Sequence, residues 1–429
     1  MNILYVGDNR DRLNWGCRAT SIALHDLISS DHKIIGTIYG KESLAGFTPV
    51  LHGSIFPRRT HGVIHKFRKK KLLNIPHKLF VMSGGKSDYI SDDLDQAAAF
   101  MESKGRQYPH LASMLGLIEK ADAVVVNGEG TFIFSTPPRR DTLFYLLILK
   151  MAQRKGKKTF LLNSMFSDSP SSPRNEALIG RYMDVFRKCN FISARDMQSK
   201  RYLDEIGLNA NSAFIPDALF TWRKFYSQGL TPPVVGNTIL PFPEMEQYWN
   251  KFDFTTPYIC VSGSSVATKV EKSTLINTYV SLVQSLASVG IRIYIVPTCD
   301  GDAFLEQVAA KTNVPLIPPR VSILTGAAIL GGASAFVSGR FHPSIMASIG
   351  GTPCVFMSSN AHKTRSIQEV LEYETIREYN AVPSVDEISR IVQDVKDLLS
   401  RPEARQKITT VADKLAQSAL NIENVLNKY

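Results

Sequence analysis

The residues best suited to chemistry in this sequence are Arg340 and His342. An apolar run at 335–337 predicts a buried strand that ends at Gly339, and the pattern from Ser344 onward predicts a helix. The two side chains therefore lie between a strand's C-terminal end and a helix N-terminus, where open α/β sheets bind ligands and anions are attracted. A permanent cation beside a group that titrates near neutral pH suits an anionic substrate that needs a proton moved. The alternative is a loop arginine beside a histidine that caps the helix.

Two further strand ends carry polar residues of this kind. Arg195 follows the apolar run 191–194 and suits a forked contact with phosphate or carboxylate, or a local pair with Asp196. The sequence Asn-Gly-Glu-Gly at 127–130 follows the short predicted strand 123–126, and its glycines allow a ligand close to the backbone. Glu129 then either accepts a hydrogen bond or a proton from a substrate hydroxyl, or caps the next helix.

Weaker signals surround these positions. Gly7-Asp8 closes the first strand, and Asn14-Trp15-Gly16 precedes the first helix, a turn suited to an anion, a sugar or a purely structural role. Asp217 ends another short apolar run, and we favour a turn over a place at the site. Asp300 and Asp302 end a further strand, where capping is the expected role; a metal site would need a third oxygen ligand, so none is predicted.

The composition is that of a soluble globular protein. The chain has 429 residues, 44% of them hydrophobic and 21% charged, and no apolar run long enough for a membrane span. The first residues predict a strand rather than a signal peptide, so we expect a cytoplasmic protein. Five scattered cysteines support neither a zinc site nor a disulfide framework. The sequence does not predict an oligomeric state.

A basic segment at 56–87 holds much of the net charge of +11. No acidic residue occurs from Ser43 through Ser87, and aromatic and aliphatic residues alternate with the lysines and arginines. Such a segment suits an anionic membrane surface or an acidic polymer, or is a solvated loop. Nucleic-acid binding is not expected, because no recognised nucleic-acid module accompanies it.

Strands and helices alternate twice along the chain. The first series predicts a parallel, doubly wound α/β domain at 1–225. A proline-rich break predicts a linker or crossover at 226–256, and the alternation restarts in a second domain at 257–400. The segment 401–429 is predicted to be a C-terminal helix that crosses back to the first domain. The fold class is therefore α/β, with two Rossmann-like domains facing a cleft.

These segments resemble the polysaccharide pyruvyl transferase family over most of the chain. The resemblance rests on the order and spacing of short elements: Gly7-Asp8, Asn14-Trp15-Gly16, Asn127 to Gly130, Ser193 to Asp196 with Leu203 and Gly207, Pro216-Asp217, Pro297 with Asp300 and Asp302, and Arg340-Phe341-His342 with Pro353 and Lys363. It implies a fold like that of the GT-B glycosyltransferases. It also implies transfer of the enolpyruvyl group of phosphoenolpyruvate, as a ketal, to two hydroxyls of a cell-surface polysaccharide or its lipid-linked precursor.

The resemblance also assigns roles. Arg195 and Arg340 match arginines expected to hold phosphoenolpyruvate, Lys363 an additional anion contact, and His342 the general acid. Ser344, which follows Arg340 and His342 in the sequence, is also a candidate donor-binding residue. Phosphoenolpyruvate is a substrate, so no cofactor is expected. Since the donor carries about three negative charges, several cations near helix N-termini suit it.

The N-terminal domain is expected to hold the acceptor, a saccharide or a lipid-linked saccharide. Its candidate acceptor-binding residues are Asn14, Gly16, Gly128 and Gly130, and its candidate bases are Glu129 and Asp8. The family often has an acid where this chain has Cys17 and three glycines where it has 128–130. These departures leave the acceptor's identity open.

Two other functions remain open from the sequence. One is a GT-B glycosyltransferase that uses a nucleotide-activated sugar, with Arg340 and Lys363 on its phosphate and Glu129 as base. The other is a saccharide- or membrane-binding protein without activity. Under the pyruvyl transferase hypothesis, the basic segment holds the enzyme at the inner face of the cell membrane, where lipid-linked precursors lie.

Overall fold

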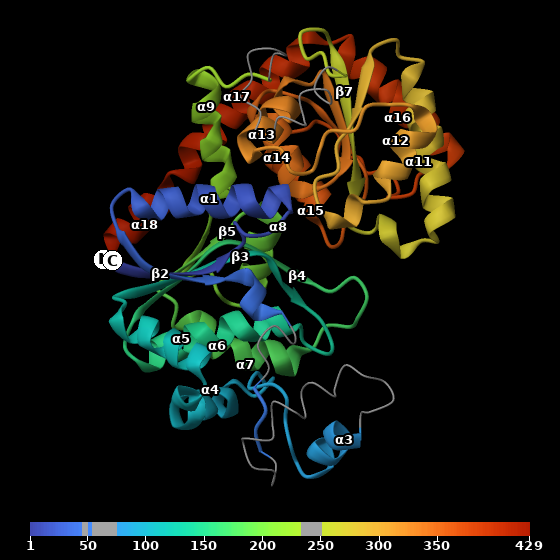
Figure 1. Cartoon of the computed structure of the whole chain (residues 1–429). Helices are drawn as coiled ribbons and strands as arrows, with labels where there is room; N and C mark the ends of the chain where they lie inside the picture. The colour runs from blue at the N-terminus through green and yellow to red at the C-terminus, as the bar shows by residue number, and fades with distance from the viewer. Residues whose placement is uncertain (45–49, 54–74, 233–250) are drawn as a thin grey trace.

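The computed structural model describes residues 1–44, 50–53, 75–232 and 251–429. These residues form two α/β domains, one above the other in Figure 1. Residues 56–74 of the predicted basic segment and residues 233–250 of the predicted linker lie outside the described part. Within it, no helix is long and apolar enough to cross a membrane.

The first domain is built on a six-stranded parallel sheet in the order β2-β1-β3-β4-β5-β6. Its strands are β1 (Asn2–Asp8), β2 (Lys33–Tyr39), β3 (Ala123–Phe134), β4 (Lys158–Asp168), β5 (Phe191–Ala194) and β6 (Ser212–Phe214). Alternate residues of β1 enter different cores: Ile3 and Tyr5 point to one face, Leu4 and Val6 to the other. This period of two, apolar on both faces, is what a parallel sheet covered by helices on each side requires.

Helices cover both faces of this sheet (Figure 1). Helix α1 lies on the face toward the second domain, and α5, α6 and α7 lie on the opposite face. The helices of this domain are α1 (Trp15–Ser29), α3 (Ile75–Met82), α4 (Leu94–Lys104), α5 (Pro109–Lys120), α6 (Arg140–Arg154), α7 (Glu176–Arg187), α8 (Met197–Glu205) and α9 (Arg223–Ser227), with the 3-10 turns η1 (Gly40–Ser43), η4 (Gly105–Gln107) and η5 (Ala218–Trp222).

The second domain has a four-stranded parallel sheet in the order β10-β9-β7-β8. Its strands are β7 (Tyr258–Ser264), β8 (Arg292–Ile295), β9 (Ala335–Gly339) and β10 (Cys354–Phe356). Its helices are α11 (Lys272–Ala287), α12 (Leu305–Thr312), α13 (Ile323–Gly332), α14 (Phe341–Ile349), α15 (Lys363–Val370) and α16 (Val385–Leu399), with the 3-10 turns η7 (Ala267–Lys269) and η8 (Asp300–Asp302). Both sheets thus have the Rossmann-like character expected from the sequence.

Three expected elements differ from those observed. The sequence pattern at 95–117 predicts one helix, but the structure has two, α4 and α5. The chain turns at Gly105, and Pro109 starts α5, where a proline costs no hydrogen bond. The short strand expected at 123–126 continues to Phe134, so Glu129 lies inside β3, at a break in its register with β4. Helix α14 begins at Phe341 rather than Ser344, so His342 lies in its first turn.

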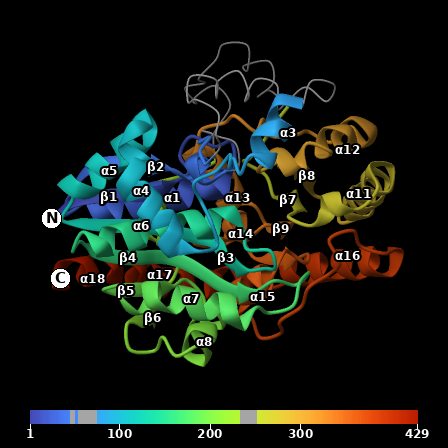
Figure 2. The same cartoon turned by 90° about the horizontal axis from the view of Figure 1, so that it is seen from below.

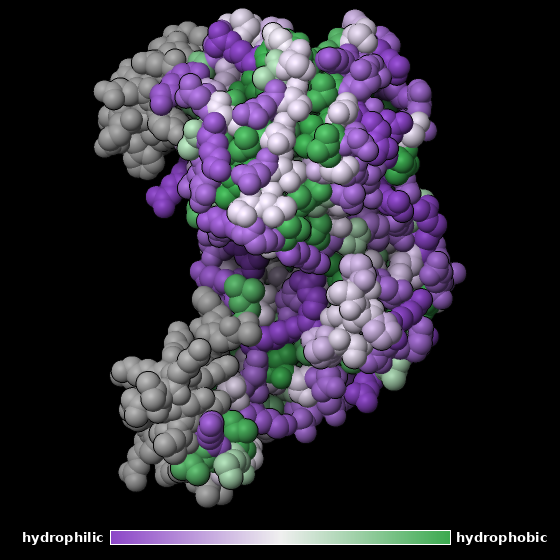
Figure 3. Space-filling view, turned by 90° about the vertical axis from the view of Figure 1, so that its right-hand side faces the viewer, coloured by the Kyte–Doolittle hydropathy of each residue, from purple (hydrophilic) through white to green (hydrophobic). Residues whose placement is uncertain are grey.

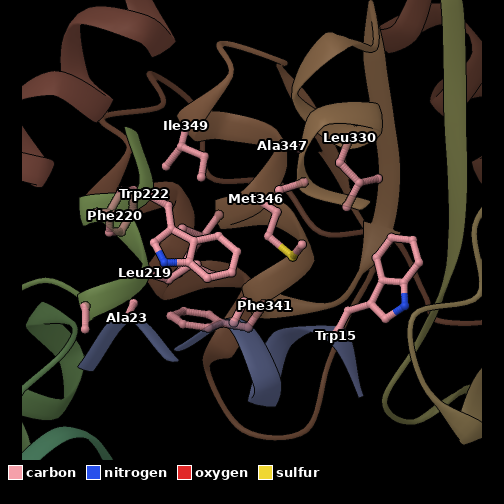
Figure 4. Packing of buried hydrophobic residues seen from close by; sticks show 14 of the residues in the cluster. Trp15, Ala23, Leu219, Phe220, Trp222, Leu330, Phe341, Met346, Ala347 and Ile349 are labelled. Carbon is pink, nitrogen blue, oxygen red and sulfur yellow. The ribbon is translucent and has the colours of Figure 1, made fainter. Parts of the chain in front are cut away.

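The domains meet through an apolar interface between α1 and the helices α13 and α14 (Figure 4). Trp15 and Phe341 are buried in it, and the Trp15 indole donates a hydrogen bond of 2.8 Å to the carbonyl of Pro319. Gly326 makes room for the indole, since a Cβ there would lie 2.6 Å from the Trp15 ring. This packing sets how the strand ends of the two domains face each other.

The end of the chain returns to the first domain. Helix α17 (Pro402–Ala419) packs against η5 and α14, and α18 (Asn421–Lys428) continues to α1 of the first domain, where Figure 1 shows it. Figure 2 shows both helices along one side of the molecule. The Asn427 amide donates to Asp31 at 2.8 Å, and the Tyr429 ring lies 5.7 Å from that of Phe160. The segment 401–429, expected as one helix, is therefore two, and both domains are tied together by the tail as well as by α1.

Candidate functional site

A cleft of about 320 Å3 lies between the domains. In Figure 3 this region is a recess between the upper and lower parts of the molecule, with hydrophilic side chains around it. The first domain contributes residues that follow β1, lie in β3 and follow β5; the second contributes the end of β9 and the starts of α14 and α15. Carboxyl ends of parallel strands meet here, which is where α/β domains bind ligands.

Arg195, His342 and Asp217 form a buried triangle at this cleft. The Arg195 Nη1 atom lies 3.0 Å from His342 Nε2 and 3.4 Å from Asp217 Oδ2, and His342 Nε2 lies 3.2 Å from the same carboxylate oxygen. Arg195 is 1% exposed and stacks over the Phe341 ring at 4.2 Å, whereas its Nε has no hydrogen-bond partner among the described residues. A buried guanidinium with an unused donor beside a cleft is prepared for an anionic ligand.

Asp217 is held from its other side. Its Oδ1 atom accepts hydrogen bonds from the Thr20 hydroxyl at 2.6 Å and from the Leu219 amide at 3.0 Å. Burial by itself raises the pKa of Asp217, but His342, Arg195 and Thr20 outweigh it and lower that pKa to about 2. The carboxylate is therefore charged at neutral and at mildly acidic pH.

The second domain adds two more cations. Arg340 donates from Nη2 to Asp302 Oδ1 at 2.5 Å, and its Nε also lacks a partner in the described part of the chain. The Lys363 ammonium donates to Asn360 at 3.0 Å. Burial, with help from Arg195, lowers the pKa of Lys363 to about 8. Lys363 is therefore charged at neutral pH and loses its charge in mildly alkaline solution.

Glu129 is one of two acids, with Asp141, that line the cleft from the first domain. Its Oε1 atom accepts hydrogen bonds from Asn9 at 2.6 Å, Asn127 at 3.3 Å and the Ser21 hydroxyl at 3.4 Å. Its φ of +41° is rare for a residue with a side chain, and such backbone geometry is common at functional sites. Burial, together with the Glu129 charge, raises the pKa of the neighbouring Cys17 well above normal, so this thiol stays protonated.

Asp8 and Ser344, a predicted base and a predicted donor-site residue, do not line the cleft. Asp8 is fully buried and pairs with Arg10, whose Nε donates to it at 2.7 Å. This pairing removes Asp8 from the candidate bases. The Ser344 hydroxyl donates to the carbonyl of Arg340 at 2.7 Å within α14, so its predicted place in the donor site is not supported.

The predicted acceptor-site residues have mainly packing roles. Asn14 lines the cleft, and its side chain caps α1 by accepting from the Cys17 amide at 3.1 Å. Gly130 also lines it, and a Cβ there would lie 2.9 Å from Lys363 Nζ. Gly16 and Gly128 do not line it. A Cβ at Gly16 would lie 2.4 Å from the Cβ of His342, and a Cβ at Gly128 would lie 2.0 Å from Ser164 Oγ. Gly16 thus lets α1 approach the histidine.

Several cleft residues were not predicted from the sequence. Arg12, Arg139 and Tyr145 line the first-domain wall, and Arg139 donates to Asp141 at 2.5 Å. Arg12 follows the same strand end as Gly7-Asp8, a signal that could have found it. For Asp217 the sequence favours a turn; the residue does begin one, but it also contacts Arg195 and His342.

Other features of the molecule offer less. A hollow of about 520 Å3 lies between β10 and α17, remote from these residues. Four of its charged groups form ion pairs, Arg377 with Asp394 and Lys407 with Glu374. Among the described residues, no group of three or more histidines, cysteines or acids is placed to hold a metal ion. The interdomain cleft is therefore the candidate active site.

Two UDP-GlcNAc 2-epimerases are among the solved structures that this chain resembles in fold. UDP-GlcNAc 2-epimerase from Neisseria meningitidis, solved with UDP-GlcNAc, superposes with a TM-score of 0.57 at 13% identity, over 100% of each chain. The UDP-GlcNAc 2-epimerase from Methanocaldococcus jannaschii gives 0.52 at 11% identity, over 94% of each chain. These similarities show the fold, which is GT-B-like, as expected.

Comparison of the sequence with protein families identifies the family of this chain. No curated protein matches the chain. The model of the polysaccharide pyruvyl transferase family matches residues 50–361, well over half of the chain, and this range includes Glu129, Arg195, Arg340 and His342. Family membership and the converging cleft residues lead to one conclusion: the chain belongs to the polysaccharide pyruvyl transferase family and is a transferase.

Proposed function

We propose that this enzyme transfers the enolpyruvyl group of phosphoenolpyruvate to two hydroxyls of a saccharide, forming a ketal and releasing phosphate. The observation that carries the proposal is the convergence of Arg195, Arg340, Lys363 and His342, from both domains, on one cleft. Arg195, Arg340 and Lys363 are positively charged at neutral pH, and together they match the negative charge of a phosphorylated carboxylic acid. The histidine beside them matches the need to protonate its methylene carbon.

The donor is expected to lie across the domain boundary. Arg195 and Arg340 each form an ion pair with a buried aspartate through one Nη atom. Each also has an Nε–H without a partner in the described structure. These free donors, with Lys363, suit the phosphate and carboxylate of phosphoenolpyruvate. The aspartates neutralise the charge of the two arginines in the absence of ligand. A bound anion would therefore interact with guanidinium groups that already have a counter-charge.

The proposed reaction has two additions. His342 gives a proton to C3 of phosphoenolpyruvate, which makes C2 an oxocarbenium-like centre, and a sugar hydroxyl attacks C2 while losing its proton to a base. Phosphate then leaves C2, a second hydroxyl of the same sugar attacks it, and the phosphate carries that proton away. Two C–O bonds form at C2, one C–O bond to phosphate breaks, and no oxidant or reductant is needed.

Glu129 is the proposed base for the first hydroxyl. It lies on the first-domain wall of the same cleft as His342, and its hydrogen bonds from Asn9 and Asn127 fix the carboxylate in place. General acid-base catalysis of this kind contributes about two to four powers of ten in rate. The proposed acid and base thus come from different domains and line the same cleft.

The acceptor is proposed to be a sugar of a cell-surface polysaccharide or its lipid-linked precursor. The family name supports a polysaccharide, and the basic residues of segment 56–87 support a place at an anionic membrane on the cytoplasmic side. The glycosyltransferase alternative shares the fold but has no support from the family match. A nucleotide-sugar donor is therefore the second choice.

Donor binding tests the proposal directly. Phosphoenolpyruvate at about 100 times its dissociation constant is expected to stabilise the protein by about 2.7 kcal/mol in thermal unfolding, and the shift is expected to vanish in Arg340→Ala. With a suitable saccharide, the wild type is expected to release phosphate from phosphoenolpyruvate. Stabilisation by a nucleotide sugar, with none by phosphoenolpyruvate, would contradict the proposal and favour glycosyl transfer.

The Lys363 ammonium predicts a pH limit on donor capture. Because its pKa is lowered to about 8, Lys363 is charged below that pH and neutral above it. We expect kcat/KM for phosphoenolpyruvate to be level below pH 8 and to fall with increasing pH above it, by up to about tenfold per unit. The measurement is a kcat/KM profile for the wild type and for Lys363→Arg, whose charge persists.

The arginine variant serves as the matched control. It is expected to keep an appreciable kcat/KM and to lose this alkaline limb, whereas Lys363→Met is expected to be low at every pH. A limb that stays at the same pH in Lys363→Arg would assign it to a different group.

A further inference from the structure

The contact between His342 and Arg195 raises a problem of charge. If His342 is to give up a proton, it must hold a positive charge while its Nε2 atom lies 3.0 Å from a permanent guanidinium that is 1% exposed. Little solvent is present to screen this repulsion. Left alone, the pair would favour a neutral imidazole that accepts a hydrogen bond from Arg195, which is the wrong state for a general acid.

Asp217 is placed to reverse this preference. One of its oxygens, Oδ2, lies within 3.4 Å of both cationic nitrogens, and the carboxylate is completely buried. Its other oxygen is held by Thr20 and by the Leu219 amide, and Thr20 in turn accepts a hydrogen bond of 2.7 Å from Asn163. These partners belong to the first domain, so a rigid carboxylate of one domain meets a histidine of the other.

We propose that Asp217 is a positioning residue for pyruvyl transfer: its carboxylate lets His342 carry a proton beside Arg195 and fixes the imidazole in the cleft. The inference rests on the proposed function. Asp217 is an addition to the residues of the proposed function, because it does not line the cleft and acts through His342. Besides Arg195, the charged groups that line the cleft with His342 are Arg12, Glu129, Arg139, Asp141, Arg340 and Lys363, and none of them is changed in the variants below.

Asp217→Asn tests the charge while keeping the shape. We expect kcat to fall by about ten- to a hundredfold near pH 8, with KM for phosphoenolpyruvate within about threefold. We also expect the alkaline limb of the kcat profile to move to lower pH by about one unit or more, because the imidazolium loses its counter-charge. A merely structural role would lower kcat equally at all pH values.

Asp302→Asn is the matched control. Asp302 is an equally buried carboxylate that pairs with Arg340, and it contacts no histidine in the described structure. Its loss is expected to raise KM for phosphoenolpyruvate and to leave the kcat pH profile in place. Thr20→Val offers a milder change if Asp217→Asn does not fold: it removes one of the two hydrogen bonds to Oδ1 but keeps the charge, so kcat is expected to fall severalfold without a shift of the profile.

A spectroscopic readout separates this inference from the proposed function. Nitrogen-15 NMR of histidine-labelled protein, with His342 assigned from His342→Gln, is expected to show both ring nitrogens protonated at about pH 6 in the wild type but not in Asp217→Asn. If phosphoenolpyruvate is not a substrate, this result still decides whether Asp217 keeps the histidine protonated. A neutral His342 in the wild type, or an unchanged pH profile and NMR spectrum in Asp217→Asn, would overturn the inference.

Discussion

Replacement of His342 by glutamine is expected to lower kcat for pyruvyl transfer by about two to four powers of ten while leaving phosphoenolpyruvate affinity within a few-fold. Glutamine keeps a polar group of similar reach beside Arg195 but cannot deliver a proton to carbon. The three cations proposed to bind the donor, Arg195, Arg340 and Lys363, stay in place. The measurements are phosphate release under saturating donor and the thermal shift with phosphoenolpyruvate.

His342→Gln also removes a contact between the domains, so its control variant must remove a similar contact elsewhere. His362 of the second domain pairs with Asp196 of the first at 3.0 Å, much as His342 pairs with Asp217, but it does not line the cleft. His362→Gln is therefore expected to keep kcat within about threefold. Equal losses in the two variants would show that domain contact, rather than proton transfer, explains the effect. Full activity of His342→Gln would remove it from the mechanism.

Arg195→Met is expected to have the second large effect, on stability as well as on donor binding. The change leaves Asp217 buried with one of its two cationic partners gone, and removal of one member of a buried ion pair costs about 3 to 5 kcal/mol. Binding of phosphoenolpyruvate is expected to weaken by about ten- to a hundredfold, the value of a charged hydrogen bond. Urea unfolding and donor titration measure the two losses separately.

A double-mutant cycle distinguishes these two losses. In Arg195→Met/Asp217→Asn the unpaired charge is gone, so we expect part of the stability to return, with a coupling of at least about 1 kcal/mol between the two positions. Donor affinity is not expected to return, because no cation has been restored. Additive stability losses would mean that the 3.4 Å pair contributes little to the fold.

The sequence by itself determined the parts of this protein that depend on local pattern. Apolar runs followed by glycine or a charged residue predict the parallel strands and the residues at their ends, and this pattern alone identifies Arg195, Arg340 and His342 as candidate site residues. Parallel strands bring their carboxyl ends to the same edge of a sheet, and this is why positions so distant in sequence could be expected at one cleft. The family resemblance drawn from the sequence is confirmed by the family model that matches residues 50–361.

The tertiary structure alone decided which partner each of these residues has. Asp8 and Asp217 both end apolar runs and look equivalent in sequence, yet Asp8 pairs with Arg10 and Asp217 meets His342 from the other domain. The difference comes from the packing of α1 against α14, where Gly16 allows the close approach that sets His342 beside Arg195. Contacts of this kind depend on how two separately patterned domains fit together, a property that no local stretch of residues contains.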